Sequence, residues 1–216
     1  SGGTITGARW AWGLCRGEPF AQVYRGLRDF MERTDCVQAA LEEVGRKRAT
    51  PSGRISLITA AANLYAARLV PGASFGDLVD RCEQLAEVSF NTTEFQSGLN
   101  FRFLKSASTL APIGNGKYWI EPAAARQLRL GDIIAASSCF PGGFEPIGFP
   151  DDFVWPGGSP PAGPSVAPNA LGRIPRGLAL MDGGIYDNQG AEALLQAQAR
   201  AVRKGQGFGL VVISDV

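Results

Sequence analysis

The hydrophobic pattern changes its period along the chain, and this change restricts the fold more than any other feature. Apolar residues recur at helical spacing, three or four positions apart, in six segments: 20–31, 35–47, 55–70, 75–85, 121–136 and 191–204. Residues 87–95 and 100–104 alternate instead with a period of two, around a short linker that contains Gly98. This pattern predicts a β-hairpin between two groups of helices.

Two short apolar runs, residues 178–181 and 209–214, are typical of buried strands. Helices that alternate with short apolar strands predict a layered α/β fold. We therefore expect one domain over residues 1–216, with a mainly parallel central sheet flanked by helices. A chain of this length suits one domain better than two.

Residues 141–177 hold nine of the 14 prolines and eight of the 28 glycines. So many turn-forming residues predict a long surface loop, and loops of this length are usually functional lids or disordered segments. Phe144, Phe149, Phe153 and Trp155 lie within it. These aromatic side chains either enter a membrane surface or anchor the loop to the core, and the sequence leaves both interpretations open.

The chain contains no histidine, which excludes a Ser-His-Asp triad, a Cys-His dyad and a His-ligated metal site within these residues. Lys and Arg number 21 against 20 Asp and Glu, and a net charge of +1 argues against a nucleic-acid-binding domain. No run approaches the ~20 apolar residues of a membrane span, and no signal peptide is recognisable. We expect a cytoplasmic or membrane-peripheral protein.

Four cysteines, Cys15, Cys36, Cys82 and Cys139, lie far apart among apolar neighbours and form no CxxC pair. This distribution predicts buried free thiols, which fits a reducing compartment. We expect no metal site and no cofactor.

Ser1-Gly2-Gly3 precedes a stretch that is compatible with a helix. A serine followed by glycines and a helix is the second half of a GxSxG nucleophile elbow, where a sharp turn exposes the serine oxygen. The turn also directs backbone N–H groups and the positive helix end towards an oxyanion. The alternative is that Ser1 and the glycines form a flexible tail.

Asp182-Gly183-Gly184 follows the apolar run 178–181, and ligands of open α/β sheets gather at such strand ends. The two glycines permit a tight turn and close approach of another backbone segment, although Asp182 could simply cap that turn. A serine hydroxyl needs a base, and without imidazole a carboxylate can accept its proton directly where water is excluded. Asp182 is therefore the candidate base.

Four segments in the same order resemble the patatin-like phospholipase family, which is known for a Ser-Asp dyad. They are Ser1-Gly2-Gly3; residues 91–98 with Phe101-Arg102-Phe103; residues 136–146; and Asp182-Gly183-Gly184 with Tyr186-Asp187-Asn188. The resemblance spans nearly the whole chain. It implies an α/β fold and hydrolysis of lipid acyl esters without a metal requirement for the dyad.

The resemblance also implies a role for each matching residue. Ser1 would be the acylated nucleophile, Asp182 its base, Gly183 and Gly184 the turn that supports the base, and Gly2 an N–H donor to the oxyanion. The implied partners are a lipid or acyl-ester substrate and a peripherally contacted membrane, not nucleic acid.

One part of the family pattern has no counterpart in this sequence. The family's glycine-rich oxyanion loop, which carries a basic residue, precedes the nucleophile strand. We therefore expect the chain to be truncated before Ser1. The chain also stops just after the apolar run 209–214, so we expect truncation at its C-terminus as well. The 216 residues alone should then be weakly active or inactive.

Two alternatives remain at this stage. Ser1 could act as an N-terminal nucleophile with its own α-amine as base, but such enzymes are built on stacked antiparallel sheets, and few strands are predicted here. The chain could also be a catalytically silent module of the same fold that binds lipid or protein.

Overall fold

The computed structural model describes residues 2–46, 54–106, 113–115, 117–158, 160, 167–168 and 177–211. The helices are α1 (Gly2–Cys15), α2 (Phe20–Arg33), α3 (Cys36–Gly45), α4 (Leu57–Leu64), the π-helix η1 (Tyr65–Leu69), α5 (Phe75–Arg81), α6 (Pro122–Ala125), α7 (Leu130–Ser138), α8 (Gly184–Asp187) and α9 (Ala191–Arg203). The strands are β1 (Glu87–Glu94), β2 (Leu99–Ser106), β3 (Tyr118–Trp119), β4 (Ile147–Phe149), β5 (Ala167–Pro168) and β6 (Leu178–Asp182).

Four of these strands form a sheet in the order β2-β1-β6-β4, and every neighbouring pair is antiparallel. The expectation of a mainly parallel sheet is wrong. A parallel pair needs a long crossover connection, whereas β1 and β2 are joined by a tight turn. The apolar run 209–214 supplies no strand in its described part, where Leu210 is 81% exposed. The predicted hairpin itself is confirmed, with Glu87 opposite Ser106.

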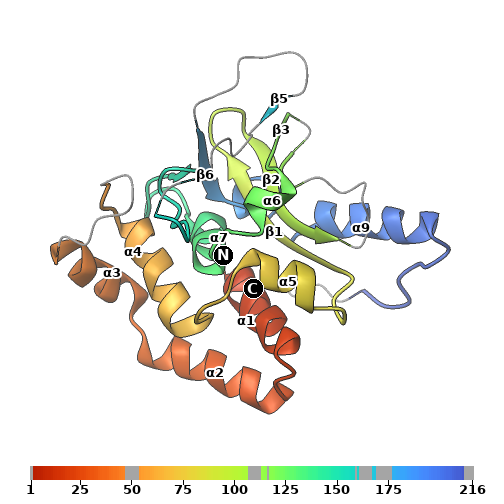
Figure 1. The fold of residues 1–216 in the computed structure, drawn as a ribbon, viewed down its shortest axis with the longest axis horizontal. Coiled ribbons are helices and arrows are strands. Elements are labelled where there is room, and N and C mark those ends of the chain that lie inside the picture. The colour runs from red at the N-terminus through yellow and green to blue at the C-terminus, as the bar shows by residue number, and fades with distance from the viewer. Residues whose placement is uncertain are drawn as a thin grey trace.

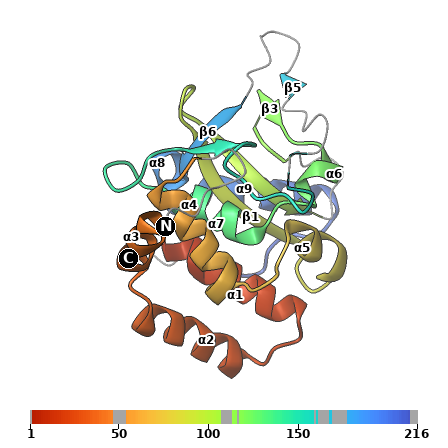
Figure 2. The same ribbon diagram turned by 60° about the vertical axis from the view of Figure 1, so that its left-hand side comes forward.

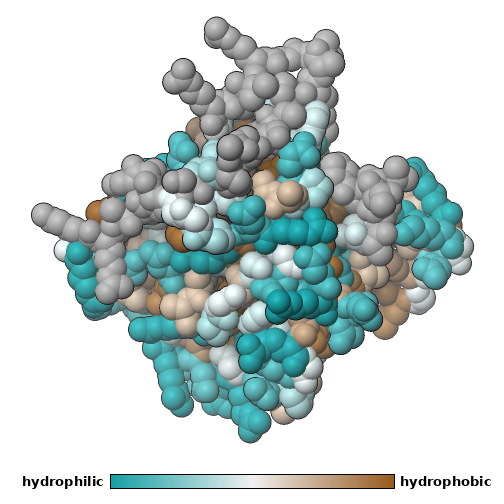
Figure 3. Space-filling view, in the orientation of Figure 1, coloured by the Kyte–Doolittle hydropathy of each residue, from teal (hydrophilic) through white to brown (hydrophobic). Residues whose placement is uncertain are grey.

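Helices lie on both faces of this sheet (Figures 1 and 2). Side chains alternate along a strand, so Phe90, Phe101 and Phe103 share the face that α7 covers, and all three are buried in the core. The other face carries Asn91 and Arg102, which lie opposite each other in the register of β1 and β2 and point towards α9. Apolar surface is visible at the right of Figure 3, over α9 and the residues that follow it.

The predicted helix 121–136 is two helices, α6 and α7, separated by a turn. The carbonyl groups of Arg126 and Leu128 accept hydrogen bonds from the N–H groups of Gly76 (3.0 Å) and Phe75 (2.8 Å), at the start of α5. These tertiary bonds replace bonds along one continuous helix. Gly131 allows α7 to approach α4 closely, because a Cβ there would lie 2.7 Å from the Ala62 carbonyl oxygen.

The described part of segment 141–177 is anchored to the core. It contains β4, which pairs with β6, so the prediction of a continuous loop is wrong. Phe149, Phe153 and Trp155 are at most 2% exposed, and Phe144 packs partly buried against the same core. The aromatic side chains therefore anchor this segment to the core, which is one of the two interpretations that the sequence left open.

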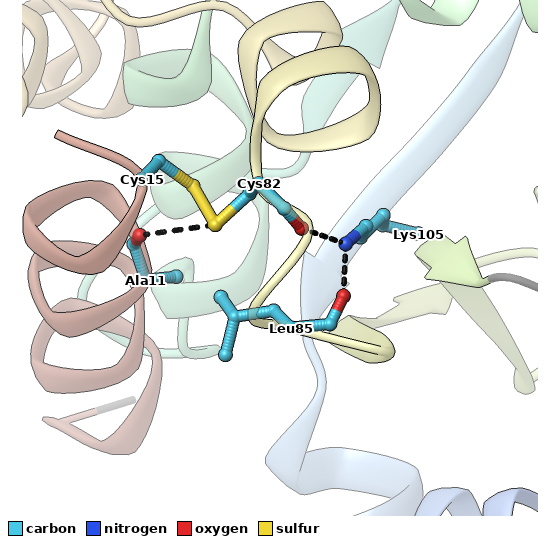
Figure 4. The surroundings of a disulfide bond; sticks show 5 residues. All are labelled: Ala11, Cys15, Cys82, Leu85 and Lys105. Atoms are coloured by element: carbon cyan, nitrogen blue, oxygen red, sulfur yellow. Dashed lines mark hydrogen bonds between the residues drawn. A yellow bond between two sulfur atoms is a disulfide. The ribbon is translucent and has the colours of Figure 1, made fainter. Parts of the chain in front are cut away.

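Cys15 and Cys82 form a disulfide between the end of α1 and the residue after α5 (Figure 4). The prediction of four free thiols is therefore wrong for this pair, whereas Cys36 and Cys139 are free. The fold brings the two Cα atoms to 4.6 Å although 67 residues separate them, which sequence spacing alone does not reveal. The Lys105 ammonium group donates to the carbonyl oxygen of Cys82 (2.5 Å) and to that of Leu85.

Among the residues described, none of the helices combines the length and the apolar character that crossing a membrane requires.

Candidate functional site

Asp182 ends β6, inside the sheet, and its surroundings hold it firmly. Its backbone N–H donates to the carbonyl oxygen of Cys139 (2.9 Å), and its own carbonyl oxygen accepts from the Thr93 hydroxyl (3.0 Å). The side chain is turned inward, since the residue is 7% exposed, and its Oδ1 accepts from the N–H of Gly184 at 2.7 Å. The residue is thus nearly buried, its backbone is fixed at both ends, and its carboxylate is oriented by the Gly184 N–H group.

The first glycine after Asp182 is required by space, because a Cβ on Gly183 would lie 2.2 Å from the backbone carbonyl oxygen of Asn91. A Cβ on Gly184 would lie 2.8 Å from Oδ1 of Asn188, the end of a side chain that can move. Gly183 has φ −63° and ψ −24°, which any residue adopts. The close approach of this turn to β1 therefore explains the glycine at position 183, where the conformational freedom of glycine is not needed.

The first turn of α1 lies beside this glycine turn. Gly3 and Thr4 line a cavity of about 270 Å³, and Gly183 and Gly184 line the same cavity. Gly2 is the first residue of α1 and is exposed, with open space around the position of a Cβ. The predicted nucleophile, Ser1, lies outside the described residues. The structure therefore brings Gly3 of the first motif and Gly183 and Gly184 of the second to one cavity, although about 180 residues separate them in sequence. The described lining of this cavity does not include Gly2 or the predicted base, Asp182.

The positive end of the α1 dipole is at this cavity. The first N–H groups of a helix have no partner within the helix, and together with the macrodipole they favour negative charge nearby. The start of α1 can therefore stabilise an anion in this cavity, and the nearly buried carboxylate of Asp182, just before the glycine turn that lines it, is a group that could accept a proton. Ester hydrolysis through a serine requires both functions.

Three residues that the sequence did not single out connect the elements around the cavity. The hydroxyl groups of Thr4 and Ser137 are 2.6 Å apart, and Ser137 donates to the carbonyl oxygen of Asn91 at 2.6 Å. This chain of bonds joins α1 to α7 and α7 to β1. Asn91 and Ser137 belong to segments that carry the family resemblance, and this was the one sequence signal that could have found them. No spacing rule distinguishes them from their neighbours in those segments.

Asp187, the other aspartate of this region, caps a helix. Its Oδ2 accepts from the N–H groups of Glu192 (3.1 Å) and Ala193 (3.3 Å), in the first turn of α9. Its side chain is 9% exposed and lies 3.9 Å from the Arg102 guanidinium group. Asp187 is thus committed to capping and charge pairing, which leaves Asp182 as the candidate base.

Cys139 lies next to the site but is unsuited to nucleophilic chemistry. Burial, followed by the nearby charge of Glu145, raises the pKa of its thiol to about 12. The thiol donates to the carbonyl oxygen of Glu145 at 2.8 Å. It remains protonated near neutral pH and has little of the thiolate character on which reactivity depends.

In the part of the chain that the structure describes, histidine, cysteine and acidic residues form no cluster of three that could hold a metal ion.

A second and larger cavity, of about 520 Å³, lies beneath α9, on the face of the sheet opposite to the one that α7 covers. Ser89, Asn91 and Gly190 line both cavities, so the two adjoin.

Comparison of the chain with protein-family models, with curated proteins and with solved structures finds no match to any of them.

Proposed function

We propose that this chain is a serine acyl-ester hydrolase of the patatin-like type, in which Ser1 is acylated and Asp182 is the base. One observation carries the proposal: the start of α1, one peptide bond from Ser1, and the turn that follows Asp182 line the same cavity. The absence of histidine from the sequence adds to it, because a Ser-Asp dyad needs no imidazole.

The reaction would proceed in two halves. Asp182 takes the proton of the Ser1 hydroxyl while the oxygen attacks the ester carbonyl, and the N-terminal N–H groups of α1 stabilise the oxyanion. The intermediate collapses, and the leaving alcohol takes the proton from Asp182. Water then attacks the acyl-serine and gives its proton to Asp182, and collapse of this second intermediate releases the acid and returns the proton to Ser1.

The proposal includes an acyl ester of a lipid as substrate, and hence contact with a membrane surface. The Cys15–Cys82 disulfide favours an oxidising compartment over the cytoplasm, because cytosolic thiols are kept reduced.

Labelling by a fluorophosphonate probe tests this function on the protein expressed from its complete reading frame. We expect the wild type to be labelled, and labelling to be lost in Ser1→Ala and in Asp182→Asn. Asp187→Asn is the matched control and should still be labelled, because Asp187 belongs to the same motif but its carboxylate caps α9. A folded wild type that resists the probe would overturn the proposal and favour a silent binding module.

A further inference from the structure

The cavity beneath α9 lies between this helix and the β1–β2 hairpin (Figure 1). Its volume of about 520 Å³ is within the range of sites that bind small molecules. Apolar side chains line its middle: Leu104 from β2, and Ala193, Leu194, Ala197 and Ala201 from α9. Alanines at every fourth position share one face of a helix and form a nearly flat wall. The middle of the cavity therefore suits a flat ring system.

One end of the cavity carries an excess of positive charge. Among the described residues that line the cavity, Glu87 at the start of β1 is the one acidic residue. Arg200 pairs with Glu87 at 2.6 Å, and Lys204 is close enough for its charge to act on Glu87 as well. One carboxylate does not balance two cations, so this end attracts an anion. The side-chain amides of Gln84 and Gln206 also line the cavity and can donate hydrogen bonds to such a group.

The other end of the cavity holds a buried arginine whose donors are not all used. The side chain of Arg102 is 8% exposed, and its Nη1 donates to Gln196 Oε1 at 2.6 Å. Its Nη2 lies 3.4 Å from the Glu192 carboxylate and 3.9 Å from that of Asp187, but neither contact is a hydrogen bond. Nε and Nη2 thus have no hydrogen-bond partner among the described residues. Because two carboxylates already face this guanidinium group, the acceptor that suits it is neutral.

The polar ends exclude a plain hydrocarbon as the matching ligand. A hydrocarbon would cover Arg102, Gln84 and Gln206 without offering them an acceptor, and burying unpaired polar groups is costly. The two ends are also well separated. Arg102 lies opposite Asn91, and four residues of extended strand between Asn91 and Glu87 correspond to about 13 Å. A two-ring body with one polar group at each end suits this distance.

We propose that the cavity beneath α9 binds a flat aromatic carboxylate with a neutral oxygen at its far end, as a ligand distinct from the ester. The carboxylate lies beside Lys204 and Gln206, the rings lie between Leu104 and Ala197, and the far oxygen accepts from Arg102. This inference goes beyond the proposed function and does not depend on Ser1.

Calorimetric titration of the protein expressed from its complete reading frame measures the Kd of three compounds. They are 6-hydroxy-2-naphthoate, its carboxamide, and 2-naphthoate, so that each comparison removes one polar group. At pH 7 the aromatic hydroxyl group is uncharged, as in other phenols. We expect 6-hydroxy-2-naphthoate to bind at least about five-fold more tightly than the carboxamide, and about two- to ten-fold more tightly than 2-naphthoate. Equal Kd values in the first comparison would overturn the anionic end, and equal values in the second would overturn the role of Arg102.

Two pairs of variants locate the binding. Lys204→Gln should bring the carboxylate and the carboxamide within two-fold of each other, whereas Arg203→Gln should keep the preference. Arg203 is the matched control, because it is an exposed cation of the same helix end and is not among the described residues that line the cavity.

Ala197→Trp fills the cavity and should weaken all three compounds at least ten-fold. Its control, Leu195→Trp, places the same side chain at a position that is 68% exposed and should leave the Kd values within two-fold. Binding that Ala197→Trp does not change would overturn the site. The expected pattern of Kd values in a protein that fluorophosphonate does not label would support the ligand site while overturning the proposed hydrolase.

Discussion

At the scale of single residues, the site depends on a close approach between the turn after β6 and strand β1. The sequence predicted a tight turn after Asp182 from the local order of residue types, and the structure has a turn at Gly183, between the end of β6 and the start of α8. Of the two reasons that the sequence offered for the glycines, a tight turn and a close backbone approach, the second holds at Gly183, which has an ordinary φ and lacks space because Asn91 is nearby. Which segment makes that approach is a tertiary contact that a sequence pattern does not specify.

The close approach makes Gly183→Ala destabilising. The added Cβ would lie 2.2 Å from the Asn91 carbonyl oxygen, which belongs to a paired strand and also accepts from Ser137. We expect a loss of about 1–3 kcal/mol in the free energy of unfolding, the usual cost of overpacking. Urea denaturation measures it. Gly45→Ala is the control, because a Cβ on Gly45 has open space in α3. Equal stability of the two variants would contradict the close approach.

At the scale of elements, the hydroxyl chain from α1 through α7 to β1 sets the position of the helix start at the cavity. We expect Ser137→Ala to slow fluorophosphonate labelling several-fold, because Thr4 and the Asn91 carbonyl lose their shared partner and the first turn of α1 is held less firmly. The cost in the free energy of unfolding should be about 1 kcal/mol.

Ser138→Ala separates positioning from stability. The Ser138 hydroxyl donates to the carbonyl oxygen of Ile134 in its own helix at 2.7 Å. We expect this variant to lose a similar amount of stability while its labelling rate stays within two-fold of wild type. If both variants label equally fast, the bond between α1 and α7 does not position the site.

The attachment of α9 should depend on the ionisation of Glu87. Burial alone would raise the pKa of Glu87, but hydrogen bonds from Arg200 and Ser106 outweigh burial and lower it. The folded state therefore favours the carboxylate. The stabilisation is present above the unfolded pKa, about 4.3, and is lost as the pH falls through the lower folded value.

Hydrogen exchange of the α9 amides, corrected for intrinsic rates, measures this attachment. At pH 7 we expect faster exchange in Glu87→Gln than in wild type, and the difference should shrink as the pH falls from the unfolded pKa of about 4.3 through the lower folded value. Glu32→Gln is the control, since it removes an exposed ion pair with Arg28 on α2. A difference between Glu87→Gln and wild type that is independent of pH would exclude the carboxylate as the cause.

At the scale of the whole molecule, local patterns predicted the elements better than their assembly. The hairpin and the helices α2 and α3 follow from hydrophobic periods over 10 to 20 residues, and the structure contains them. Strand direction depends on pairing between distant segments, such as Thr92 with Asp182, and no local pattern specifies it. For the same reason the cavity beneath α9 and the bond between Cys15 and Cys82 had no signal in the sequence.

The disulfide joins two residues that are 67 positions apart in the sequence, Cys15 and Cys82. Cross-linking a loop of this length restricts the unfolded chain, and the chain-entropy relation gives about 4 kcal/mol of stabilisation. We expect the double variant Cys15→Ser/Cys82→Ser, and the reduced wild type, to lose stability approaching this value in urea denaturation. Cys36→Ser, which changes a half-buried free thiol, should unfold at nearly the wild-type urea concentration.

Thiol counting provides the matching chemical test. Under denaturing, non-reducing conditions the wild type should show two reactive thiols, Cys36 and Cys139, and reduction should raise the number to four. In the native protein the two free thiols should react more slowly than in the denatured protein, because burial raises the pKa of both, and that of Cys139 to about 12. Four reactive thiols before reduction would show that α1 and α5 are held together by packing alone, and the reduced and oxidised proteins would then unfold together.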